Sequence, residues 1–167
     1  MAPIEVGSSA PDMTAPHPDS DGTPRSIAAA LAGGPVLLGV YKSSCQASKT
    51  MFPMLERIMA RRGSEGLSVI GVAQDSATVT KSFARRSGVT FPILIEGDGF
   101  PLTRAFDVQF TPTVFLIRPD GTVAFTAMGF LRDQVNELGD AVARELGKEP
   151  EPVIRADEED VPFFVPG

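Results

Sequence analysis

The chain has 167 residues, enough for one domain with a hydrophobic core, and its 43% hydrophobic and 22% charged residues are ordinary for a globular protein. The net charge of −6 provides no basic surface for nucleic acid or an anionic membrane. One cysteine and one histidine exclude an intrachain disulfide and a cysteine- or histidine-rich metal site, so we expect no metal and no cofactor.

The first half of the chain predicts a buried strand followed by a helix. Its first 34 residues are rich in Pro, Gly, Ser and Asp, which is typical of turns, with one short helix expected over 26–31. The apolar run 35–41 predicts a central strand. Apolar residues at helical spacing then predict a helix that begins near Cys45 and ends at 61–63.

Residues 67–106 predict two further pairs of a strand and a helix. Residues 67–73 read as a strand, and Asp75-Ser76 can cap a helix that ends at Gly88. A strand over 91–95 and a short helix over 102–106 follow.

The strands at 113–117 and 122–126 flank the turn Asp120-Gly121 and predict an antiparallel hairpin. A final amphipathic helix carries Val135 and Leu146 on one stripe. This order predicts an α/β fold with a central mixed β-sheet and helices on both faces.

We expect one domain over residues 1–147 and an acidic, Pro-rich tail over 148–167. The tail has two basic and six acidic residues, and we expect it to be mobile, with its aromatic end a candidate for docking. The start of the chain lacks a basic region followed by an apolar one, and no apolar run is long enough for a membrane span. The expected location is the cytoplasm, although a trimmed secreted protein would look the same.

Several motifs occur together in the order of one known family. Cys45 begins the pattern Cys-x-x-Ser at the end of the first long strand, Gly7-Ser8-Ser9-Ala10-Pro11-Asp12 opens the chain, and Thr111-Pro112-Thr113 precedes the hairpin. Over residues 5–147 the chain resembles the thioredoxin-like superfamily, in particular its TlpA/ResA-like branch, which overlaps with AhpC/TSA-type redoxin domains. The resemblance implies a thioredoxin fold with an N-terminal extension and an extra βα insertion.

The resemblance also implies a redox site at Cys45. A cis Thr111-Pro112 bond would lie beside the thiol and leave the Thr111 backbone free to pair with a substrate chain. Ser48 replaces the family's second cysteine, either natively or as an engineered change, and Met51 stands where the ResA-like branch often has a carboxylate.

The residues around Cys45 suggest how its thiolate is stabilised. A thiol at a helix start has its pKa lowered by free N–H groups and by the helix dipole. Ser44 and Ser48 are candidate hydrogen-bond donors to the thiolate, and Lys42 adds positive potential. A buried, inert cysteine is the competing interpretation.

Three functions fit this pattern. The first is a monothiol thiol–disulfide oxidoreductase, in which Cys45 forms a mixed disulfide with a disulfide-bearing protein or a glutathione-type partner and an external thiol resolves it. The second is a one-cysteine peroxiredoxin-like peroxidase, although Lys42 replaces the threonine of that pattern. The third is a thioredoxin-fold binding module with impaired redox chemistry.

Overall fold

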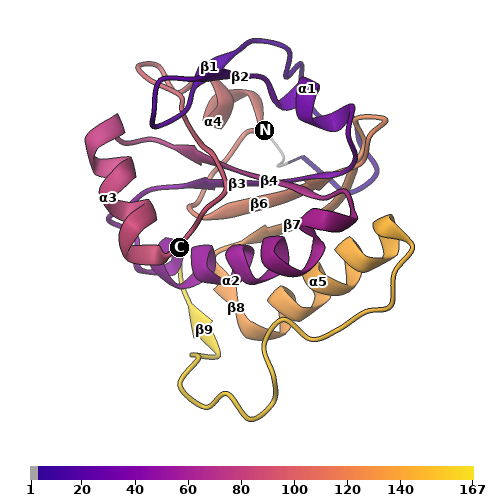
Figure 1. Cartoon of the computed structure of the whole chain (residues 1–167). Coiled ribbons are helices and arrows are strands. Elements are labelled where there is room, and N and C mark those ends of the chain that lie inside the picture. Colours follow the sequence, from indigo (N-terminus) through magenta and orange to yellow (C-terminus); the bar gives the residue numbers. More distant parts are fainter. Residues whose placement is uncertain (1–3) are drawn as a thin grey trace.

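A computed structural model describes residues 4–167 and shows a five-stranded sheet covered by helices on both faces (Figure 1). The strand order is β5-β4-β3-β6-β7. Strands β3, β4 and β5 are parallel, while β6 is antiparallel to β3 and β7 is antiparallel to β6. The predicted mixed sheet is therefore confirmed.

The elements follow the predicted order. Their bounds are β1 His17–Pro18, β2 Pro24–Arg25, α1 Ile27–Leu31, β3 Val36–Tyr41, α2 Gln46–Arg62, the 3-10 helix Gly63–Glu65, β4 Ser68–Ala73, α3 Ala77–Ser87, β5 Ile93–Ile95, α4 Pro101–Ala105, β6 Thr113–Ile117, β7 Val123–Met128, β8 Phe130–Leu131, α5 Arg132–Leu146 and β9 Phe164–Val165. The extension carrying β1, β2 and α1 precedes the central strand. Between β4 and β6 the chain forms α3, β5 and α4.

The central strand β3 is buried along its whole length, so its side chains supply both halves of the core. Leu37 and Tyr41 face a cluster that includes side chains of α2, α3 and α5. Leu38 and Val40 face the opposite cluster, which includes side chains of α1 and α4. Because side chains alternate along a buried strand, β3 contributes to both clusters, with α2, α3 and α5 on one face of the sheet and α1 and α4 on the other.

Strands β1 and β2 form a small antiparallel hairpin around residues 19–23, consistent with the turn expected there between short extended pieces. The pairing of β9 with β8 in a separate two-stranded sheet was not predicted. Strand β5 is shorter than expected because pairing with β4 begins only at Ile93. The second hairpin strand is longer than expected and continues to Met128.

The expected mobile tail is instead packed against α2 and α5. Val153, Ile154 and Val161 are buried in the same cluster as the helices. The Asn136 side-chain oxygen accepts the N–H groups of Val153 and Ile154, both at 2.9 Å, and Arg57 forms an ion pair with Glu158 at 2.9 Å. The tail stays in place for two reasons. Its few apolar residues pack on an apolar surface of the helices, and arginines of the helices bind its carboxylates and carbonyls.

Within residues 4–167, no helix combines the length and the apolar character that crossing a membrane requires.

Candidate active site

Cys45 lies where the central strand passes into the longest helix. It occupies the N-cap position of α2, with φ −84° and ψ 123°, and its side chain is half-buried. The Cys45 N–H donates to Lys42 O at 3.1 Å, which closes the turn after β3. Because β3 lies in the middle of the sheet, this connection carries the thiol to the end of the sheet beside the start of β6.

The segment before β6 meets Cys45 from the other side. Thr113 pairs with Val40 near the end of β3, so the residues that precede Thr113 reach the thiol. The Thr111–Pro112 peptide bond is cis, as the resemblance implies. The Cys45 thiol donates to Thr111 O with an Sγ to O distance of 3.2 Å, so residues far apart in the sequence share one site.

Ser48 lies in the first turn of α2 and is fully buried. While the thiol is protonated and donates to Thr111 O, the Ser48 hydroxyl has no hydrogen-bond partner among residues 4–167. A buried hydroxyl without a partner costs free energy, which an anion able to accept its proton would recover. Ser48 is therefore a latent donor to the thiolate.

Two opposing effects set the pKa of Cys45. Partial burial of the sulfur acts to raise it, whereas the Ser48 N–H and hydroxyl, the Thr111 side chain and the Ala47 N–H act to lower it. The hydrogen bonds prevail, so the pKa of the Cys45 thiol lies below its ordinary value. The helix start thus favours a thiolate, which is the nucleophilic form.

The other predicted neighbours of the thiol lie further from this chemistry. Ser44 and Lys42 are exposed, and neither takes part in the hydrogen bonds that lower the thiol pKa. Met51 is buried in the core, so the position at which the ResA-like branch often has a carboxylate is apolar here. The structure therefore brings together Cys45, Ser48 and the Thr111-Pro112 step, with Ser44 at the rim.

Sequence reasoning missed one residue that positions the active-site loop. The pair Asp75-Ser76 was expected to cap α3, and Ser76 does so by accepting the Val79 N–H at 3.3 Å. The Asp75 carboxylate instead accepts the Ser43 N–H at 2.9 Å. The available signal was the parallel pairing of β3 and β4, which brings the residues that follow both strands to the same end of the sheet.

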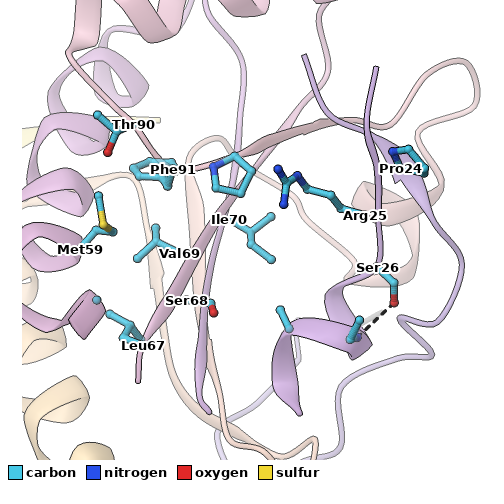
Figure 2. Close-up of a pocket in the computed structure, with 14 residues that line it drawn as sticks. Pro24, Arg25, Ser26, Met59, Leu67, Ser68, Val69, Ile70, Thr90 and Phe91 are labelled. Carbon is cyan, nitrogen blue, oxygen red and sulfur yellow. Dashed lines mark hydrogen bonds between the residues drawn. The ribbon is translucent and has the colours of Figure 1, made fainter. Parts of the chain in front are cut away.

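A groove away from the thiol is lined by other residues. Figure 2 shows this cavity of about 740 Å³, with Leu67, Val69 and Phe91 on one side and Pro24 and Arg25 on the other. None of the predicted site residues lines it. Within residues 4–167, no group of three or more His, Cys, Asp or Glu side chains is placed to hold a metal ion.

Comparison with known proteins identifies the family. The model of the AhpC/TSA family matches residues 6–126, which include the Cys45 loop and the Thr111-Pro112 step. The chain belongs to the AhpC/TSA family. This AhpC/TSA protein is also 29% identical over 133 residues to the thiol-disulfide oxidoreductase ResA of Bacillus subtilis (strain 168), a match that covers 79% of this chain and 72% of ResA.

Solved structures share its fold. A thiol:disulfide interchange protein of the thioredoxin family from Chlorobium tepidum TLS has a TM-score of 0.71 at 21% identity, covering 86% of this chain and 100% of that one. Peroxidoxin BcpB from Mycobacterium tuberculosis has the same TM-score of 0.71 at 22% identity, covering 86% and 97%. The predicted thioredoxin-like fold is thus confirmed.

Proposed function

We propose that this AhpC/TSA protein is a monothiol thiol–disulfide oxidoreductase. The observation that carries the proposal is the Cys45 thiol at the start of α2, half-buried, with a lowered pKa and next to the backbone of Thr111. The fully buried Ser48 occupies the place of a second thiol and supplies a hydrogen bond in place of a second nucleophile.

In the proposed reaction the Cys45 thiolate attacks one sulfur of a disulfide. A bond forms between Cys45 Sγ and that sulfur while the original S–S bond breaks, and the departing sulfur leaves as a thiolate that takes up a proton. Cys45 is oxidised to the mixed disulfide as the departing sulfur is reduced. An external thiol, of the glutathione type or from a second protein, then attacks the mixed disulfide and releases Cys45.

A one-cysteine peroxidase is the second candidate, because one of the structures that share the fold is peroxidoxin BcpB. In that reaction the Cys45 thiolate would attack a peroxide oxygen and become a sulfenic acid, with water or an alcohol as the departing product. Against this candidate, Lys42 stands three residues before the cysteine and is exposed to solvent. The site therefore lacks a hydroxyl at that position to hold a peroxide.

The proposal is tested by the pH dependence of Cys45 alkylation and by mass spectrometry after brief exposure to oxidised glutathione or to hydrogen peroxide. We expect alkylation to begin at lower pH than for free cysteine and a glutathione adduct to form on Cys45. In Ser48→Ala the alkylation profile moves to higher pH, because one hydrogen bond to the thiolate is lost. Cys45→Ser is the control that abolishes both adducts.

The outcomes separate the candidates. Rapid sulfenic acid formation without a glutathione adduct would favour the peroxidase. A thiol with an ordinary or raised pKa that forms neither product would refute both reactions and leave the binding module as the better interpretation.

A further inference from the structure

The last segment of the sequence runs beside the proposed active site as an added strand. Strand β9 pairs with β8 in antiparallel register, with Val165 opposite Phe130 and Phe164 opposite Leu131. The Arg132 N–H continues this pairing by donating to Phe163 O at 2.9 Å. Figure 1 shows β9 alongside β8, after the long excursion of the chain beyond α5.

Beyond β9 the segment reaches Thr111, whose carbonyl oxygen accepts a hydrogen bond from the Cys45 thiol. A Cβ placed on Gly167 would lie 2.5 Å from Thr111 O, the atom to which the Cys45 thiol donates. A Cβ placed on Gly129 would lie 3.4 Å from Gly167 N and 3.5 Å from Val165 O. The backbone of the segment therefore passes between Gly129 and Thr111, whose carbonyl oxygen lies 3.2 Å from Cys45 Sγ.

Residues 155–161 are anchored by Arg132, whereas the residues after Val161 are held by fewer contacts. The Arg132 guanidinium donates to the carbonyls of Arg155, Glu158 and Val161 at 2.6, 2.6 and 3.0 Å, and Val161 is buried. Past this anchor, Phe163 and Phe164 are 63% and 59% exposed. The last residues thus bury little apolar surface, and a competing strand would displace them at modest cost.

The surroundings of the same edge are apolar and exposed. Phe110, which precedes Thr111, is 57% exposed, and Met128, which precedes Gly129, is 50% exposed. Large exposed apolar side chains gathered around one site are typical of a surface that binds another polypeptide.

We propose that residues 162–167 occupy, within the same chain, the edge on which an extended polypeptide substrate lies. This inference rests on the proposed oxidoreductase function and names its substrate class: an extended segment with apolar residues near its disulfide, which pairs with β8 in place of β9. Small disulfides reach the half-buried Cys45 while β9 stays paired with β8. The segment therefore slows the attack of Cys45 on polypeptide disulfides and leaves the rate of its attack on small disulfides unchanged.

The test compares two disulfides as substrates of the full chain. Oxidised insulin is the polypeptide probe and glutathione disulfide the small one, and mass spectrometry follows mixed-disulfide formation on Cys45. Val165→Pro removes an N–H from β9 and is incompatible with its pairing. Phe163→Ala is the matched control, because it removes an exposed ring and leaves the backbone pairing intact.

In Val165→Pro we expect the rate with insulin to rise about tenfold, since the apparent affinity scales with the fraction of molecules whose edge is open. The rate with glutathione disulfide stays the same, which also shows that the site is folded. A chain that ends at Val161 is a second variant, retains the Arg132 anchor and has the same expected result.

Equal insulin rates in Val165→Pro and the unmodified chain, with glutathione disulfide reacting in both, would overturn this inference and leave the proposed function standing. Failure of glutathione disulfide to react with any variant would overturn both.

Discussion

Gly139 offers a sharp test of how the last segment is fixed to the domain. It lies inside α5, where glycine costs about 1 kcal/mol relative to alanine. A Cβ at this position would lie 2.6 Å from Val153 Cγ2, whereas ordinary contacts begin at 3.4 Å. Gly139→Ala therefore forces the buried Val153 side chain to retreat by about 0.8 Å or to leave its site.

Two opposing magnitudes decide the sign of the effect. The helix gains about 1 kcal/mol from alanine. Burial of a valine side chain contributes about 1.5–3 kcal/mol, which is lost if Val153 is expelled. We therefore expect Gly139→Ala to destabilise the protein by about 1 kcal/mol, in spite of the better helix residue.

The sign reverses when the obstructing methyl group is removed. Val153→Ala deletes Cγ2, and the nearest remaining atoms, Glu151 O and the Cβ of residue 153, lie 3.8 and 3.9 Å from the new methyl group, which is ordinary contact. In this background Gly139→Ala fits and stabilises by about 1 kcal/mol, so the two substitutions are coupled by about 2 kcal/mol.

Urea unfolding followed by far-UV circular dichroism measures all four proteins, with equal m-values as the check that one transition is being compared. An equal change in the free energy of unfolding on Gly139→Ala in the unmodified chain and in Val153→Ala would show that Val153 does not pack against Gly139. That result would refute the packing of the tail on α5.

Two further predictions concern the thiol and the acid response. Ser48→Cys places a second thiol in the first turn of α2, and we expect insulin reduction to rise at least about tenfold because intramolecular resolution replaces collision with an external thiol. Ser48→Ala is the control, and no gain would show that the apolar surroundings of Met51 do not support a dithiol cycle. Arg57 and the Arg155 N–H lower the pKa of Glu158, so its stabilising contribution is present above the ordinary value of 4.5 and is lost as the pH falls below it. We expect Glu158→Gln to flatten the fall of the urea midpoint between about pH 6 and pH 3, and an unchanged profile would contradict this assignment.

Local patterns in the sequence were enough to predict most of the architecture. The apolar run before Cys45 predicted a buried strand, and helical spacing after it predicted α2, because the two periodicities depend on neighbouring residues alone. The turn at Asp120-Gly121 likewise predicted the hairpin of β6 and β7. The Cys-x-x-Ser pattern and the later Thr-Pro step together indicated the site.

The functions of Asp75 and Gly139 depend on partners that local patterns do not reveal. Asp75 has the spacing of a helix cap, and only the pairing of β3 with β4 brings it to the Ser43 N–H. From the sequence, Gly139 is an unfavourable residue inside a helix. Only the packing of Val153 against it explains why a glycine stands there.

The sequence by itself determined that this protein has one thiol at a strand-to-helix junction and a serine where a second thiol would stand. The tertiary structure decided that Thr111 O lies 3.2 Å from that thiol and that an acidic tail, expected to be mobile, returns along β8 to the same place. The physical reason is that strand identity is encoded by neighbouring residues, whereas docking depends on distant surfaces, here the arginines and apolar faces of α2 and α5.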